Sequence, residues 1–183
     1  MKKVLLALMM GAGVAMLAVP AASAHAVVSP YMPQGSALTG ARTAYVLRVP
    51  NERTNRATYK VTMNVPQAVQ TAISVLYMPG WNIKLTRVDT GARTAEGAPI
   101  MATTSVTWTA KKGMQIMPGF YTELFFRFQN PLTPTKLCFP TLQYYGGTLN
   151  AKGLAKGAGE LVSWTGDASS ATPASCVDIV SGK

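Results

Sequence analysis

The stretch that decides the fold is residues 58–65, TYKVTMNV, which alternates polar and apolar side chains and stops at Pro66. In an extended strand, successive side chains point to opposite faces, so a period of two marks a strand with one buried face. Residues 81–85, WNIKL, repeat the alternation directly after a Pro-Gly pair. Both stretches predict strands of a sheet that covers an apolar core.

The same short, punctuated pattern recurs along the chain. Proline, glycine and asparagine interrupt the apolar segments at a spacing of roughly 8–12 residues, which is typical of an all-β sandwich or barrel. No window carries a sustained 3.6-residue apolar period, so long helices are not expected. The length of 183 residues fits one domain. The other expected strands are residues 44–49, 72–77, 106–109, 121–128, 137–139 and 161–164, and residues 150–159 are expected to form a long hairpin loop.

The N-terminus has the pattern of a cleaved secretory signal peptide. Two lysines precede an apolar run over residues 4–19, and Ala22-Ser23-Ala24 places small residues at the positions that signal peptidase requires. We therefore predict that residues 1–24 are removed and that His25 begins the mature chain. Two alternatives remain open: a cut after Ala26, which would discard the histidine, and an uncleaved membrane anchor, for which the apolar run is short.

The charge of the chain indicates a basic surface rather than a nucleic-acid site. Seventeen lysines and arginines stand against seven acidic residues, a net charge of +10, or +8 once Lys2 and Lys3 are removed. The positive residues are scattered, and the tightest group is Lys111-Lys112. We therefore expect no nucleic-acid partner. We also expect no membrane span after cleavage of the signal peptide. Since no C-terminal anchor is apparent, we expect a periplasmic location.

The two cysteines, Cys138 and Cys176, predict one disulfide. An isolated pair in an exported chain is usually oxidised, and no Cys-x-x-Cys redox pair is present. The bridge would tie the C-terminal tail, residues 167–183, to the strand around residues 137–139. The alternative, a thiolate metal site, needs both sulfurs in the reduced state.

The motifs of common enzymes are absent from the sequence. The predicted mature chain has one histidine, His25, and it lacks a Gly-x-Ser-x-Gly elbow, a glycine-rich phosphate loop and a His-Glu-x-x-His zinc motif. The seven acidic residues are spread out, and nothing singles out a pair for glycoside hydrolysis. We expect that the protein is not an enzyme.

An N-terminal histidine offers two nitrogen donors to one metal ion. The free α-amine and the ring Nδ1 close a six-membered chelate ring, and both lose their protons near neutral pH. Two nitrogens in a plane suit Cu(II), which also heads the divalent affinity order. An N-terminal His25 therefore indicates a Cu(II) site, unless the histidine is only an accident of the cleavage position.

Several motifs, in order, resemble the YcnI-like family of exported copper-binding proteins, also called the domain-of-unknown-function 1775 family. They cover roughly residues 24–166. They are SAHAVVSP (23–30), YVLRVPNE (45–52), MPGW (78–81), VTW (106–108), PGFYTELF (118–125), LQY (142–144) and LVSW (161–164). The resemblance implies a single immunoglobulin/cupredoxin-like Greek-key β-sandwich over residues 25–166.

The resemblance also implies a mono-histidine brace for Cu(II), made by the amine and Nδ1 of His25, the carboxylate of Glu123 and a nearby Trp164. Glu123 stands in an apolar strand, where a carboxylate is costly to bury unless it is paired or ligated. The alternative is that Glu123 lies on the solvent face of an amphipathic strand and binds no metal. A Gly- and Lys-rich insert that follows Gly147 and runs through Gly159 separates Tyr144 from Trp164 more than is usual in the family. Trp108, Trp81 and, as a second carboxylate, Glu160 therefore stay open as alternatives.

Three functions are weighed against these features. The first is copper storage, delivery or scavenging, with a copper chaperone or transporter as partner. The second is a copper-independent β-sandwich for protein binding or adhesion. The third, a polysaccharide monooxygenase, needs a second histidine that the sequence lacks. In addition, Met114 and Met117 form a Met-x-x-Met pair whose thioethers would suit a second site, for Cu(I).

Overall fold

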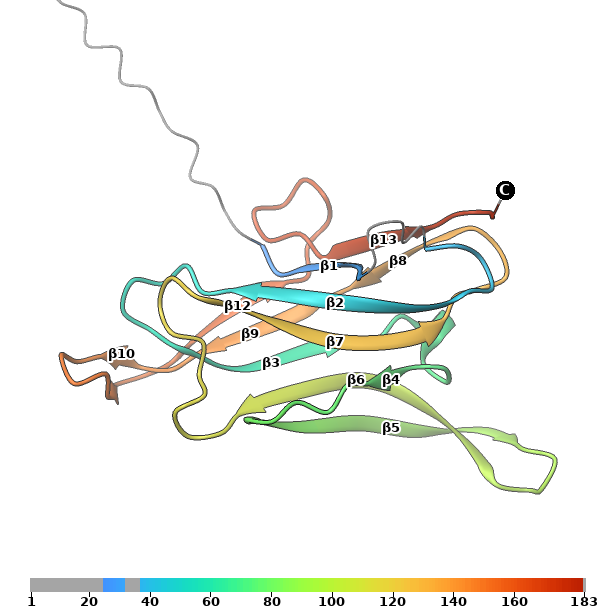
Figure 1. The fold of residues 1–183 in the computed structure, drawn as a ribbon, viewed down its shortest axis with the longest axis horizontal. Coiled ribbons are helices and arrows are strands. Elements are labelled where there is room, and N and C mark those ends of the chain that lie inside the picture. Colours follow the sequence, from blue (N-terminus) through green and yellow to red (C-terminus); the bar gives the residue numbers. More distant parts are fainter. Residues whose placement is uncertain (1–24, 32–36, 183) are drawn as a thin grey trace, which may run out of the picture.

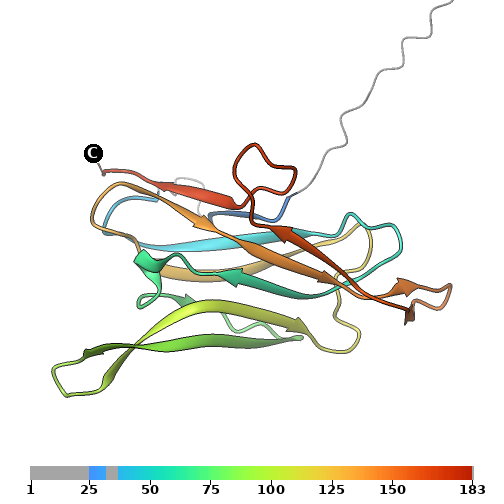
Figure 2. The ribbon, with the colours of Figure 1, turned by 180° about the vertical axis from the view of Figure 1, so that it is seen from behind.

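The computed structural model describes residues 25–31 and 37–182, which form two facing antiparallel sheets (Figures 1 and 2). The first sheet has the strand order β1-β2-β7-β4 and the second β12-β9-β3-β6-β5. The all-β prediction is confirmed. The predicted signal peptide, residues 1–24, lies outside the described residues. The strands of the first sheet are β1 (Val27–Pro30), β2 (Arg42–Pro50), β7 (Tyr121–Gln129) and β4 (Ser74–Val75).

The second sheet and two short ladders complete the fold. Its strands are β12 (Glu160–Trp164), β9 (Thr141–Tyr145), β3 (Thr58–Asn64), β6 (Pro99–Ala110) and β5 (Trp81–Arg93). The first ladder joins β13 (Ser175–Ile179) to β8 (Thr135–Phe139). The second joins β10 (Thr148–Leu149), just before the expected 150–159 loop, to β11 (Ala155–Lys156), inside it. A short 3-10 helix, η1 (Gln67–Val69), follows β3.

The core lies between the two sheets and follows from the alternation in the sequence. In β3, the apolar positions Val61 and Met63 are fully buried. From the opposite sheet, β7 contributes Leu124, Phe126 and Phe128. The ring of Phe128 stacks on Tyr45 of β2 at 4.3 Å. Residues from both sheets therefore pack in a single cluster, as expected for a sandwich.

Three predicted strands differ markedly in length from the observed ones, and one of them, residues 106–109, is only part of β6, which begins at Pro99. Of the expected strand 72–77, only Ser74 and Val75 pair, at the edge of the first sheet. The expected strand 81–85 extends to Arg93, because β5 and β6 form a long hairpin that projects from the sandwich (Figure 1). The outer part of β5 is exposed on both faces. Its sequence therefore shows no polar–apolar alternation from which a strand could be predicted.

The predicted disulfide joins Cys138 to Cys176, which are directly paired in the β8–β13 ladder. It ties the C-terminal segment to the strand expected from the sequence. That segment is also part of the packed fold, because Val177 and Ile179 of β13 belong to the core cluster. Within the described part of the chain, no helix is long and apolar enough to cross a membrane.

Candidate metal centre

His25 lies at the edge of the sandwich, against Trp164. Their rings meet edge to face, with centroids 5.2 Å apart and planes inclined at 82°. His25 directly precedes the edge strand of the first sheet, and Trp164 ends the edge strand of the second. The sheets therefore bring together two residues that are 139 positions apart in the sequence.

The loop between β12 and β13 reaches over to the imidazole. His25 Nε2 lies 3.3 Å from the carbonyl oxygen of Ala171, and both views show this loop rising beside β1 (Figures 1 and 2). Asp167 shapes the loop by accepting a hydrogen bond from the Ser169 amide at 3.1 Å. The amide of Val28 donates to the hydroxyl of Ser175 at 2.8 Å, which fastens the start of β13 to β1.

The contact with Ala171 selects a tautomer of His25. A carbonyl oxygen can only accept a hydrogen bond, so Nε2 carries the proton in the neutral ring. Nδ1 is then the ring nitrogen without a proton, and it is the one that can share a metal ion with the α-amine of the same residue. Metal-binding histidines commonly donate their other ring N–H to a backbone carbonyl in this way.

A buried hydrogen-bond network fixes the indole against which His25 rests. Trp164 Nε1 donates to Gln143 Oε1 at 3.0 Å, and Gln143 Nε2 donates to the carbonyl of Pro50 at 2.8 Å and to Thr58 Oγ1 at 2.9 Å. Gln143 is fully buried. The network therefore links β12, β9, β3 and the end of β2 directly behind the imidazole.

Replacing this amide tests the network. In Gln143→Leu, the Trp164 indole N–H and the Pro50 carbonyl lose a buried partner, so the free energy of unfolding should fall by about 1–3 kcal/mol. Urea unfolding measures the loss, and the exposed Gln67→Leu is the control, expected to change stability by no more than about 0.5 kcal/mol. Equal stability of the two variants would show that the network contributes nothing.

Glu123 occupies the outer face of β7. Its side chain is 29% exposed and pairs with Arg48 of β2, with Arg48 Nε donating to Glu123 Oε1 at 2.8 Å. Arg48 also donates to Ser29 Oγ at 2.9 Å. The inward positions of β7 are Leu124, Phe126 and Phe128. The argument that Glu123 is costly to bury in an apolar strand therefore does not hold, because the carboxylate is outward-facing and already paired.

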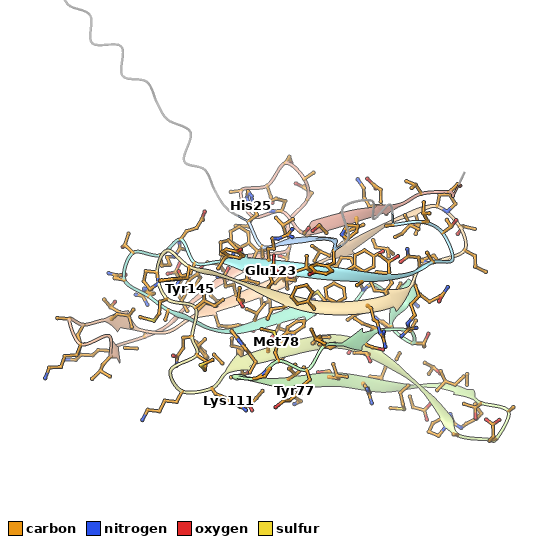
Figure 3. The ribbon with its side chains drawn as sticks, in the orientation of Figure 1. His25, Tyr77, Met78, Lys111, Glu123 and Tyr145 are labelled. Atoms are coloured by element: carbon orange, nitrogen blue, oxygen red, sulfur yellow. A yellow bond between two sulfur atoms is a disulfide. The ribbon has the colours of Figure 1, made fainter. Side chains whose placement is uncertain are left out.

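The strand ladders show at which end of the first sheet Glu123 and Glu52 lie relative to His25. Arg48 of β2 pairs with Val27 on one side and with Glu123 on the other, so Glu123 lies two strands away from β1 (Figure 3). Strands lie about 4.8 Å apart and rise about 3.3 Å per residue, which places the Cα atoms of His25 and Glu123 about 12 Å apart. Because β1 and β2 are antiparallel, the start of β1, which His25 precedes, lies beside the end of β2, which Glu52 follows.

Glu52 is the residue that the sequence analysis did not select. It follows Pro50, the last residue of β2, by two positions, and its side chain is exposed. Its negative charge acts on its neighbours, since it contributes to raising the pKa of Arg53 and of Tyr145. The sequence contained one signal, the YVLRVPNE motif that ends in Glu52, but the pairing of β1 with β2 is needed to place the residue at the same end of the sheet as His25.

The alternative residues lie elsewhere. Glu160 is held by two arginines: Arg53 Nε donates to it at 3.1 Å, and Arg56 Nε lies 3.7 Å from it. Hydrogen bonding to Glu160 is the main cause of the raised pKa of Arg53. Trp108 is fully buried in β6, and Trp81 starts β5. Of the three tryptophans, Trp164 is the one in ring contact with His25.

The described residues contain no group of three or more His, Cys, Asp and Glu side chains that could hold a metal ion. The donor set of His25 and one carboxylate fits Cu(II), which accepts nitrogen and oxygen in a plane.

Comparisons with known proteins place the chain. Residues 25–175 match the sequence model of a family described as "Domain of unknown function (DUF1775)". The chain is 29% identical over 162 residues to the "Copper-binding protein CutI" of Bacillus subtilis (strain 168), covering 88% of this chain and 65% of that protein. The chain therefore spans about two thirds of the length of this curated relative.

A solved structure shows the same fold. It is an uncharacterized protein from Nocardia farcinica, described as having an immunoglobulin-like fold, with a TM-score of 0.60 and 22% identity over 86% of this chain and 99% of that one. The expected immunoglobulin-like sandwich is thus confirmed. The matched residues 25–175 include both His25 and Trp164, and the match confirms the family resemblance seen in the ordered sequence motifs. The chain belongs to the DUF1775, or YcnI-like, family.

Proposed function

We propose that the protein is an exported copper-binding protein, without enzymatic activity, that holds one Cu(II) ion at a mature N-terminus beginning with His25. The ion takes the α-amine and Nδ1 of His25 and one carboxylate oxygen. Trp164 stands against the imidazole and keeps its orientation. The periplasm is the proposed location, and copper storage, delivery or scavenging, with a chaperone or transporter as exchange partner, is the proposed role.

One observation carries this proposal: the carbonyl of Ala171 faces Nε2 of His25. It assigns the ring proton to the nitrogen that an N-terminal chelate does not use. The name of the Bacillus subtilis relative adds support, since that protein is described as copper-binding. The fit of a soft-to-borderline ion to two nitrogens and one oxygen makes Cu(II) the preferred divalent metal.

Two carboxylates compete for the third position. The family resemblance points to Glu123, which would first have to leave Arg48 and then bridge about 12 Å between Cα atoms. The antiparallel pairing of β1 with β2 points to Glu52, which follows the end of β2 beside the start of β1. The ion pair of Glu123 and Arg48 could instead serve to hold β1 in place through Ser29.

The test is a Cu(II) titration of the mature chain followed by electron paramagnetic resonance. We expect one bound Cu(II) with two nitrogen donors from one residue, and loss of this signal in His25→Ala. Glu52→Gln and Glu123→Gln identify the carboxylate, because only the ligand variant should change the copper spectrum. Glu96→Gln, on an exposed carboxylate of the β5–β6 hairpin, is the control. An unchanged spectrum in His25→Ala would exclude the proposed site.

A further inference from the structure

Three methionines gather at one surface pocket of about 420 Å³, away from His25. Met78 comes from the turn before β5, and Met114 and Met117 come from the loop between β6 and β7. Figure 3 shows Met78 on the far side of the sandwich from His25. The predicted mature chain contains six methionines in all, so half of them line this pocket.

Met114 and Met117 are exposed, although methionine normally fills gaps in a core, whereas Met78 is half-buried and packs against the core cluster. Met114 is 50% exposed and Met117 is 38% exposed. By contrast, Met63 is fully buried in the core, as methionine usually is. The pocket therefore presents sulfur to solvent at positions where packing alone does not require it.

The backbone holds the loop residues in place over the turn. Lys111 N donates to Gly80 O at 2.8 Å, and Met114 N donates to Lys111 O at 3.0 Å. Gly80 has a φ of +88°, and a Cβ there would lie 2.7 Å from the terminal methyl carbon of Met114. The thioether of Met114 thus rests directly on the turn that carries Met78.

The other end of the loop is fixed by a buried side chain. Asn51 Nδ2 donates to the carbonyl of Ile116 at 2.7 Å. Ile116 also exchanges two backbone hydrogen bonds of 2.9 Å with Thr58, and Phe120 N donates to Met117 O at 3.1 Å. Met117 is therefore carried by an ordered part of the loop, so its position in the pocket is set by the fold.

The chemistry of the lining selects one kind of ion. Among the residues that the structure describes, those lining the pocket include no carboxylate and no imidazole; they combine thioethers with the aromatic rings of Trp81, Phe120 and Tyr121. Neutral, polarizable sulfur favours soft monovalent ions such as Cu(I), whereas Mg²⁺ and Ca²⁺ require oxygen ligands. Aromatic faces also attract a cation.

We propose that Met78, Met114 and Met117 form a Cu(I) site, separate from the Cu(II) centre proposed at His25. The three sulfurs supply the ligands, and Trp81 shields the ion from the core side. This site does not depend on the amine of His25, so it stands or falls independently of that centre.

The test uses the mature chain labelled with ¹³C at the methionine methyl groups and titrated with Ag(I), a diamagnetic soft ion that serves as the probe. The methyl resonances of Met78, Met114 and Met117 should shift together and saturate at one ion per chain. Those of Met63 and of Met101, which is 39% exposed on β6, should not move. An equal shift of Met101 would reveal nonspecific thioether binding and overturn the proposal.

Cu(I) itself is then measured by anaerobic competition with a chromophoric Cu(I) chelator. The double variant Met114→Leu and Met117→Leu keeps the apolar volume of the two side chains. It should bind Cu(I) at least about tenfold more weakly, because even the loss of a residue that only hydrogen-bonds to a metal ligand weakens metal binding by that factor. Met101→Leu is the matched control. His25→Ala should keep the pocket site. Unchanged Cu(I) affinity in the double variant, or loss of the pocket shifts in His25→Ala, would refute it.

Discussion

A mature chain that keeps the four residues Ala21-Ala22-Ser23-Ala24 before His25 is expected to lose its tight Cu(II) binding. Four residues are used because a histidine at the second or third position would bind Cu(II) anew through the added amine and the intervening amide nitrogens. The extension converts the α-amine into an amide, whose nitrogen lone pair is delocalised into the carbonyl. The chelate then loses one of its two nitrogens, although the imidazole and its contacts with Trp164 and Ala171 are unchanged. The dissociation constant for Cu(II) should rise by at least about 100-fold. Loss of a residue that only hydrogen-bonds to a metal ligand weakens metal binding by up to about that factor, and loss of a ligand atom itself should cost more.

Isothermal titration against a competing chelator measures this change. Removing the extension with a protease that leaves His25 first should restore the affinity, which shows that the extended chain was folded. The same extension on His25→Ala should have no further effect. An extended chain that binds Cu(II) as tightly as the native one would contradict the chelate.

The second large effect is expected for the disulfide. Replacing Cys138 and Cys176 by serine removes a bridge between residues 38 apart in the sequence, and should lower the free energy of unfolding by about 2–4 kcal/mol. The loss follows from the greater freedom of the unfolded chain. Cu(II) binding should weaken as well. The disulfide holds β13, which is fastened to β1 through Ser175, and the loop before β13 carries Ala171, whose carbonyl faces His25.

Urea unfolding of the double variant gives the stability change. The control lies in the same ladder: Lys136 and Asp178 are an exposed pair 3.9 Å apart, and their replacement by serine should change stability by no more than about 0.5 kcal/mol. If the cysteine variant unfolds at the native urea midpoint, the bridge has no stabilising role.

The sequence predicted the central strands because burial alternates there. Val61 and Met63 mark β3, and the phenylalanines of β7 mark its inner face. It did not predict β13, where Val177 and Ile179 alternate with polar neighbours over only five residues. The small polar stretch before it suggested a tail, and the core contacts that hold β13 arise from β8 and β1, which are distant in the sequence.

The candidate site was predictable where it depends on one residue and unpredictable where it depends on pairing. His25 follows from the cleavage motif, and Trp164 from its family motif. The partner of Glu123 did not follow, because Arg48 is 75 residues away and meets it only through the β2–β7 register. The same applies to Glu52, which the β1–β2 register brings toward His25.

The most direct measurement is native intact mass, with N-terminal sequencing, of copper-loaded protein taken from the compartment to which it is exported. Our account predicts a chain that starts at His25, has an unmodified amine and carries one copper ion released by His25→Ala. Copper-loaded protein that starts at Val27, or whose first residue is acetylated, would contradict it.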